Sequence, residues 1–137
     1  MLARPLASET VTARAVCRLK CSVVANVAAV RERVAAAAGR AGRDPGEVTL
    51  VAVAKLFPAD AVRAVVAAGV ADVGENYAKD LERKAAEVPG VRWHFVGRLQ
   101  RNKAGVLVRA GALVHSLDSL AGARALGRRA VAAGTTA

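Results

Sequence analysis

Aromatic residues are scarce in this sequence of 137 residues, in which Trp, Tyr and Phe together account for 3%. Hydrophobic residues still make up 54%, mostly Ala and Val, and this excludes the composition of a disordered chain. The sequence therefore predicts a core of small aliphatic side chains, each of which buries less apolar area than Phe or Leu. Its length is sufficient for one domain with a core of its own.

Cysteine and histidine are too few for several common sites. Cys17 and Cys21 lie four residues apart, and neither a second Cys pair nor a matching His pair completes the about four ligands of a zinc site. Two packed thiols are the simpler interpretation, and nothing indicates a secreted disulfide framework. Two histidines also give no basis for a Ser-His-Asp set, so we expect neither a metal site nor a hydrolytic triad.

Long uncharged apolar runs are missing as well. No stretch of about 18 such residues occurs, and we therefore expect no membrane span. Residues 1–25 are basic, with Glu9 as their single acid, and weakly resemble a transit peptide. Arg18 and Lys20 interrupt any signal-peptide core, and the expected location is the cytoplasm.

The net charge of +10 raises the question of nucleic acid. The basic residues are spread along the whole chain, without a block of five or more. Neither stacking aromatics nor a known nucleic-acid motif accompanies them, and the glycine-rich nucleotide-binding motifs are also absent. A basic protein that binds nucleic acid electrostatically is therefore only an alternative function, and nucleic acid is not the expected partner.

From residue 48 onward, strand-like and helix-like segments alternate. Short β-branched runs predict strands, and apolar residues at steps of three and four predict helices. The predicted strands are residues 48–53, 70–74, 91–97 and 112–117, and the predicted helices are residues 59–68, 78–88, 102–110 and 119–132. A further helix is predicted over residues 23–38, whereas residues 1–22 show no clear period and are expected to be an extension or a frayed helix.

This alternation predicts an α/β fold of parallel strands with helical crossovers, because the strands recur every 20 to 22 residues or so. An open doubly wound sheet and a closed barrel both use it. The regular spacing and short loops favour the first four strand–helix units of a TIM (β/α)8 barrel. Residues 48–53 are expected to form a strand that is buried on both faces.

Lys55 follows directly on the first predicted strand, at the end that faces the ligand mouth in parallel α/β folds. Its neighbours Val53, Leu56 and Phe57 are expected to desolvate the amine, which favours the neutral form. A neutral amine can attack an aldehyde and form a Schiff base. The alternative is a lysine at a strand end that simply reaches water.

The second predicted strand ends in Gly74, Glu75 and Asn76. Asn76 offers a donor and an acceptor that could orient a ring substituent, and Glu75 could pair with a base or with a helix N-terminus. In the following helix, Leu81, Ala85 and Val88 share one face. Lys84 is placed with the charged residues outside that face.

Further polar residues surround the third and fourth predicted strands. His94 is expected on the face opposite its aromatic neighbours, as a packed and hydrogen-bonded residue rather than a catalyst. His115 has no identifiable partner. Asn102 is a predicted N-cap for the next helix, and Gln100 and Lys103 could bind an anion at that helix start.

Four of these segments and the lead-in helix resemble the pyridoxal phosphate homeostasis protein family. The matching stretches are residues 48–58 (VTLVAVAKLFP), 72–77 (DVGENY), 92–103 (RWHFVGRLQRNK) and 114–120 (VHSLDSL), with residues 26–43 as the lead-in helix. The resemblance covers roughly residues 24 to 130. It implies a barrel like that of the N-terminal domain of alanine racemase, with residues 1–22 as a non-matching extension and residues 23–137 as the N-terminal half.

The resemblance also implies a site and a cofactor. Pyridoxal 5'-phosphate (PLP) would be bound as a Schiff base on Lys55, with Asn76 beside it. Members of the family are regarded as carriers of PLP without established turnover, so an enzyme is not expected, and PLP-dependent apoenzymes are the implied partners. A racemase-like PLP enzyme is the alternative, but it needs a second acid/base group, and the one tyrosine, Tyr77, lies in the binding loop.

Two departures from the family pattern stand out. The residues that flank the lysine are usually Ser and Thr, whereas here they are Ala54 and Leu56. The phosphate-binding loops of the family lie in the second half of the barrel, and this sequence ends at Ala137. The sequence therefore predicts that the 137-residue chain on its own binds PLP weakly or folds poorly.

Overall fold

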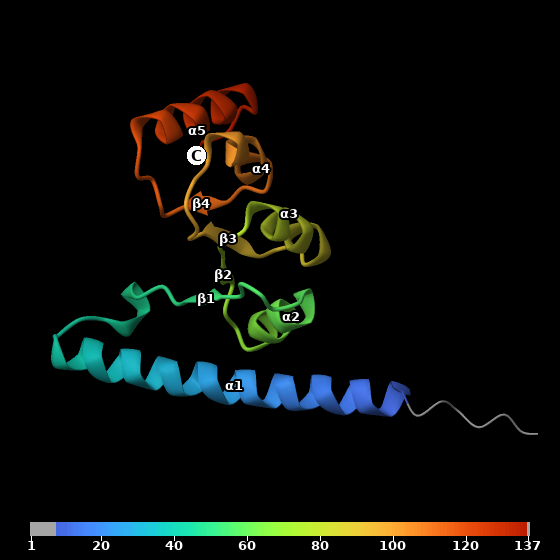
Figure 1. Ribbon diagram of the computed structural model, residues 1–137. Coiled ribbons are helices and arrows are strands. Elements are labelled where there is room, and N and C mark those ends of the chain that lie inside the picture. Colours follow the sequence, from blue (N-terminus) through green and yellow to red (C-terminus); the bar gives the residue numbers. More distant parts are fainter. Residues whose placement is uncertain (1–7, 137) are drawn as a thin grey trace, which may run out of the picture. The chain divides into compact units, whose positions relative to one another are not determined.

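The computed structural model describes the backbone of residues 8–136 and the side chains of residues 22–136 (Figure 1). The chain divides into two compact units after Val48, and each is described by itself. Among the described residues, none of the helices is both long and apolar enough to cross a membrane.

The first unit consists of α1 (Ser8–Arg40) and the short 3-10 helix η1 (Pro45–Glu47). α1 begins at Ser8, before the predicted start at residue 23, so from Ser8 onward the chain follows the predicted alternative of a helix rather than an irregular extension. After the helix, Gly42 adopts φ +65°, a conformation that favours glycine. The predicted thiol packing of Cys17 and Cys21 lies outside the residues whose side chains are described.

The second unit is a four-stranded parallel sheet in the order β1-β2-β3-β4, with helices between the strands. The strands are β1 (Val51–Val53), β2 (Asp72–Glu75), β3 (Arg92–Phe95) and β4 (Leu113–Val114). The helices are α2 (Ala59–Ala67), α3 (Ala78–Glu87), η2 (Arg101–Lys103), α4 (Ala104–Arg109) and α5 (Leu120–Ala132). The predicted α/β alternation with parallel strands is confirmed, although each strand is shorter than predicted.

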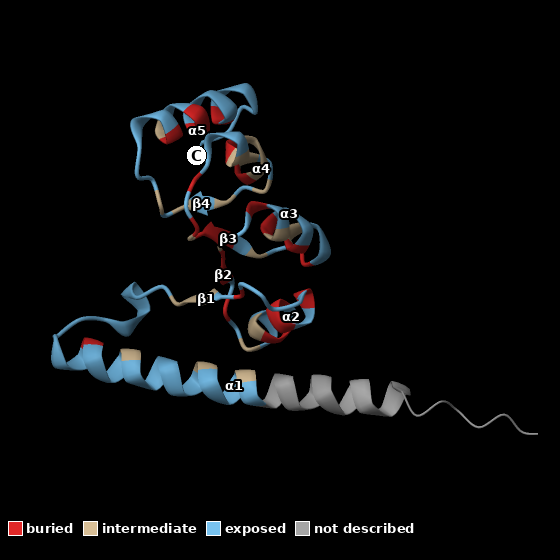
Figure 2. Ribbon diagram, in the orientation of Figure 1, coloured by how far each residue is buried: buried red, intermediate tan, exposed pale blue. Residues whose placement is uncertain are grey.

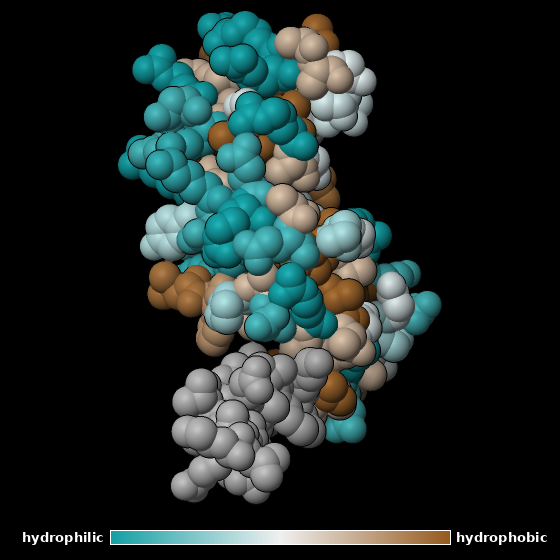
Figure 3. Space-filling view, turned by 90° about the vertical axis from the view of Figure 1, so that its right-hand side faces the viewer, coloured by the Kyte–Doolittle hydropathy of each residue, from teal (hydrophilic) through white to brown (hydrophobic). Residues whose placement is uncertain are grey.

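The core lies between the sheet and the helices of this unit (Figure 2). Val73, Trp93 and Phe95 point from the strands into the core, where they meet buried helical residues such as Val62 and Leu81. The outer side of the helices is largely hydrophilic, and hydrophobic residues reach it only in scattered patches (Figure 3). Small aliphatic residues thus fill the core together with a few large ones.

The other face of the sheet is much less covered. Val53 in β1 and Leu113 in β4 are 49% and 54% exposed. The prediction that the first strand is buried on both faces is therefore wrong. β1 and β4 are the edge strands of the described sheet, and the face opposite the core is exposed there, whereas Asp72 and His94 of the central strands are buried on it.

Candidate functional site

Lys55 lies where the sequence placed it, in the turn directly after β1. The backbone N–H of Ala54 still donates to the carbonyl oxygen of Gly74 at 2.8 Å, so the pairing of β1 with β2 reaches the residue before Lys55. The Lys55 side chain is exposed. The expected desolvation is wrong for the described chain, because Leu56 and Phe57 are themselves 82% and 55% exposed and cannot shield the amine.

The turn that carries Lys55 contains a strained residue. Leu56 has φ +66°, and it is the one residue other than glycine in the described chain with a positive φ. A left-handed conformation costs an ordinary L-residue about 1 to 2 kcal/mol. Such strain tends to concentrate at ligand-binding segments, where it is retained because the geometry is useful. The strained backbone at Leu56 therefore indicates a ligand-binding segment next to Lys55, independently of the sequence motif.

Asn76 follows the end of β2, and two contacts fix its backbone. The Oε1 atom of Glu75 accepts the N–H groups of Asn76 at 2.7 Å and of Tyr77 at 3.3 Å, just before α3 begins. Gly97, after β3, lies against the same residue, because a Cβ atom at this position would come within 2.0 Å of the Asn76 carbonyl oxygen. Glu75 thus binds the two residues directly before α3, next to the helix N-terminus that was one of its two predicted partners.

The other predicted partner of Glu75, a base, is also present, although the sequence did not identify it as Lys84. Its Oε2 atom lies 2.5 Å from Nζ of Lys84, and both side chains are buried, at 0% and 1% exposure. The Lys84 ammonium also donates to the carbonyl oxygen of Ala54 at 2.8 Å. The placement of Lys84 outside the buried helix face is therefore wrong. Lys84 lies three residues after Leu81 and four before Val88, and this spacing could have identified it.

A second polar cluster lies at the start of β2 and on β3. Asp72 accepts two hydrogen bonds from Arg92, at 2.8 and 2.6 Å, and its Oδ1 atom is 2.8 Å from Nε2 of His94. His94 is buried and hydrogen-bonded, as predicted. The expectation that His115 has no partner is wrong, because its Nε2 atom lies 2.8 Å from Nδ1 of His94.

These contacts stabilise the ionised form of Asp72. Hydrogen bonds from Arg92 lower the pKa of the Asp72 carboxyl to about 2, against the opposing effect of its burial, and His94 contributes in the same direction. A carboxyl whose pKa is lower in the folded state stabilises the fold above its unfolded pKa, and this stabilisation is lost as the pH falls through the folded value. The relevant window runs from the unfolded pKa value of 3.8 down to about pH 2.

Asp72→Asn is therefore expected to remove one component of the acid sensitivity of folding. The shift corresponds to about 1 to 2 kcal/mol at neutral pH, reduced from its full value because Arg92 is 67% exposed and screened by water. Urea denaturation between pH 7 and pH 2.5 would measure this for both proteins. The difference in their free energies of unfolding should shrink as the pH falls, and a constant difference would contradict the assignment.

A cavity of about 400 Å³ lies beside Asn76. Its lining includes the cationic side chains of Lys79, Arg98 and Lys103 as well as Gln100, so it offers positive charge and amide groups together. Lys55 does not line it. Asn102 is not the predicted N-cap, because the 3-10 helix η2 starts at Arg101 and takes Gln100 as its cap residue. Anion binding by Gln100 and Lys103 stays a prediction.

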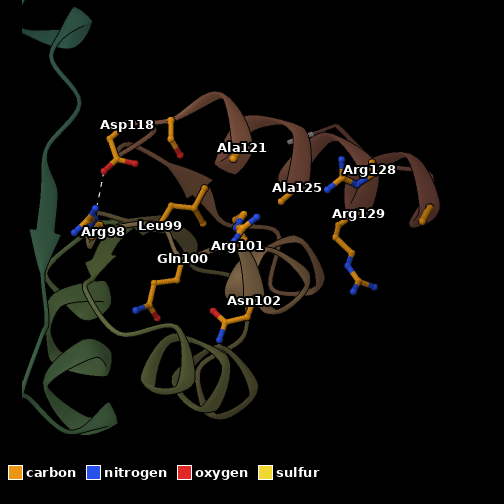
Figure 4. A pocket seen from close by; sticks show the side chains of 12 residues that line it. Arg98, Leu99, Gln100, Arg101, Asn102, Asp118, Ala121, Ala125, Arg128 and Arg129 are labelled. Carbon is orange, nitrogen blue, oxygen red and sulfur yellow. Dashed lines mark ion pairs between the residues drawn. The ribbon is translucent and has the colours of Figure 1, made fainter.

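A larger cavity of about 1090 Å³ adjoins it and shares Arg98 and Gln100. Arg101 comes from η2, and Arg128 and Arg129 come from α5 (Figure 4). Arg98 pairs with Asp118 at 3.3 Å, and both side chains are exposed. This rim of the sheet unit therefore carries a strongly positive surface. Within the described part of the chain, no group of three or more His, Cys, Asp or Glu residues could hold a metal ion.

No family model matches the chain, but individual proteins do. The chain is 43% identical over 119 residues to the pyridoxal phosphate homeostasis protein of Mycobacterium tuberculosis, covering 78% of this chain and 46% of that protein. It is 44% identical over 101 residues to the protein of the same name from Pseudomonas aeruginosa, covering 72% and 44%. The chain is related to the pyridoxal phosphate homeostasis proteins.

Solved structures agree with this relationship to the pyridoxal phosphate homeostasis proteins. PipY of Synechococcus elongatus PCC7942, in a structure with PLP bound, is 40% identical with a TM-score of 0.62, and the match covers 77% of this chain and 50% of PipY. The chain thus spans about half the length of the relatives it matches. The resemblance read from the four sequence motifs is confirmed.

Proposed function

We propose that this chain is a cytoplasmic PLP-binding protein of PLP homeostasis, which holds the cofactor as a Schiff base on Lys55 while Asn76 orients the ring. The observation that carries this proposal is the pairing of β1 with β2 up to their ends. The Ala54–Gly74 hydrogen bond puts the turn of Lys55 and the loop of Asn76 side by side at the same end of the sheet. The PLP-bound structure of the related PipY supports the choice of ligand.

The residues at this end of the sheet fit the chemistry of PLP. When bound, PLP supplies an aldehyde, which reacts with amines, together with a polar ring and a phosphate. Lys55 provides an exposed amine, and Asn76 provides an amide with both a donor and an acceptor. Arg98 and Lys103, in the cavity beside Asn76, create a positive potential that attracts a phosphate group.

We further propose that residues 23–137 correspond to the first four strand–helix units of a (β/α)8 barrel, with residues 1–22 as an extension. Two observations support this. The relatives are about twice as long as the matched region, and the open sheet face around Val53 and Leu113 is suited to be covered by further strands. In this arrangement the open face would become the barrel interior.

A carrier role without turnover suits the site better than racemisation. The related proteins are named for homeostasis, and the one tyrosine near the site, Tyr77, is 53% exposed in the same loop as Asn76. An acid/base group on the opposite side of the ring is therefore not provided by this loop. PLP-dependent apoenzymes are the proposed recipients of the cofactor, and assays for alanine racemisation are expected to give no activity.

Titration of the chain with PLP is expected to produce the absorbance band of a Schiff base, and Lys55→Ala is expected to abolish it. Borohydride reduction should then attach the cofactor covalently, and peptide mass mapping should locate it at Lys55. Lys20→Ala, in α1, is the control and should keep the band. Equal absorbance in the unsubstituted chain and in Lys55→Ala would refute the proposed attachment.

A further inference from the structure

The binding role proposed above does not use the buried ion pair of Lys84 and Glu75. Lys84 Nζ and both carboxylate oxygens of Glu75 form hydrogen bonds within the second unit. Lys84, on α3, reaches the end of β1 through the Ala54 carbonyl oxygen and the end of β2 through Glu75. Glu75 uses its other oxygen for the N–H groups of Asn76 and Tyr77.

These contacts end next to both proposed PLP-binding residues. Ala54 directly precedes Lys55, and Asn76 directly follows Glu75. Lys84 and Glu75 therefore form a continuous bridge, from the backbone before Lys55 to the backbone of Asn76, that spans two strand ends and one helix. Neither charged group has another described hydrogen-bond partner, so the pair is committed to these two segments.

Stability alone is a weak reason for such a pair. Removing two charges from water is costly, and well-packed apolar residues of similar size often serve a fold equally well or better. What an apolar pair cannot do is hold backbone groups at fixed points by hydrogen bonds. The bridge does this at 2.8 Å to Ala54 and 2.7 Å to Asn76, where small displacements would change the geometry of a bound ring.

We propose that Lys84 and Glu75 are positioning residues for PLP, which set the relative placement of the Lys55 turn and the Asn76 loop through the Ala54 carbonyl and the Asn76 N–H group. This inference rests on the proposed function. Lys84 itself does not react with the cofactor, because its ammonium is buried and bonded to Glu75.

The test variant is Lys84→Met/Glu75→Gln. It leaves no buried charge without a partner, and the Gln side-chain oxygen can still accept the N–H groups of Asn76 and Tyr77. What it lacks is the ammonium link to Ala54. The matched control is Arg83→Met/Glu87→Gln, which removes an exposed ion pair at 2.8 Å from the same helix. A second test variant, Lys84→Gln/Glu75→Gln, retains polar groups at both positions and serves if the first does not fold.

Three quantities are measured for each protein: the free energy of unfolding without PLP, the Kd for PLP from the Schiff-base band, and the rate at which the band forms. We expect the test variant to stay folded but to bind PLP at least about tenfold more weakly and more slowly, with the control unchanged. Amide hydrogen exchange at Asn76 and Tyr77, measured without PLP, should be faster in the test variant than in the control.

The outcomes separate this inference from the proposed function. A normal Kd and rate in a folded test variant would overturn the positioning role and leave Lys55 as the attachment site. The absence of any band in the unsubstituted chain would overturn the proposed function, and the positioning role with it. A loss of affinity that is equal in the test variant and the control would also overturn the inference, because it would reflect α3 in general.

Discussion

Lys84→Met is expected to destabilise the chain by about 3 to 5 kcal/mol, the largest effect of any single substitution considered for the second unit. The substitution removes the ammonium and leaves the Glu75 carboxylate buried at 0% exposure without its counter-charge. A buried charge without a partner either remains at high cost or takes up a proton, and both lower stability at neutral pH. Because small domains are stable by only about 5 to 15 kcal/mol, this loss would be a large fraction of the total free energy of unfolding.

Urea denaturation at pH 7 would measure this effect, with Arg83→Met as the control. Arg83 precedes Lys84 on α3 and pairs with Glu87 at the surface, where an exposed ion pair contributes at most about 1 kcal/mol. The double variant Lys84→Met/Glu75→Gln should recover most of the loss, since it removes the unpaired charge. A cost for Lys84→Met no larger than that of Arg83→Met would show that the pair is not buried as described.

Gly97→Ala is expected to destabilise the chain by about 3 kcal/mol. The added Cβ atom would lie 2.0 Å from the carbonyl oxygen of Asn76, which is far inside van der Waals contact. The obstacle is backbone rather than a flexible side chain, so it cannot move aside by changing rotamer. Either the segment after β3 or the Asn76 loop must shift, and the second change would also alter the proposed PLP site.

Gly127→Ala is the matched control for this substitution. Gly127 lies within α5, and a Cβ atom there would meet nothing within 4 Å. Alanine is the better helix former, so this variant should be as stable as the unsubstituted chain or more stable by up to about 1 kcal/mol. Thermal or urea denaturation of both variants gives the comparison. Equal stabilities would mean that Gly97 does not approach Asn76 as closely as described.

The alternation of elements could be predicted from the sequence because each strand and each helix carries its own local pattern. Valine-rich runs marked the strands near Val51, Val73 and Val114, and the helices between them followed the expected periods. The ends of α4 and β4 were less predictable, because the chain inserts the 3-10 helix η2 and pairs only two residues of β4. A local sequence pattern does not show how many residues of a strand form hydrogen bonds with the neighbouring strand.

The polar contacts of the site cannot be predicted from local sequence patterns, because they join residues that are far apart in the sequence. Glu75 and Lys84 are nine positions apart, and Lys84 was assigned by its charge to the solvent side. His94 and His115 are 21 positions apart and meet only because β3 and β4 are neighbours. For Lys55 the sequence left both burial and exposure open, and the exposed alternative holds because the apolar neighbours Leu56 and Phe57 are themselves exposed. Burial of a charge depends on a distant partner, which single-sequence reasoning does not supply.

The contact between His94 and His115 has a consequence for the exposed ring. Two ring nitrogens 2.8 Å apart can share one proton but cannot each carry one toward the other. In the state of His94 that carries a single proton on Nε2, donated to the Asp72 carboxylate, Nδ1 of that ring accepts and Nε2 of His115 donates. His115 is thereby held in a single tautomer whose Nδ1 lone pair is left free. Through that state of His94, a carboxylate inside the sheet unit thus sets the tautomer of an imidazole at the surface.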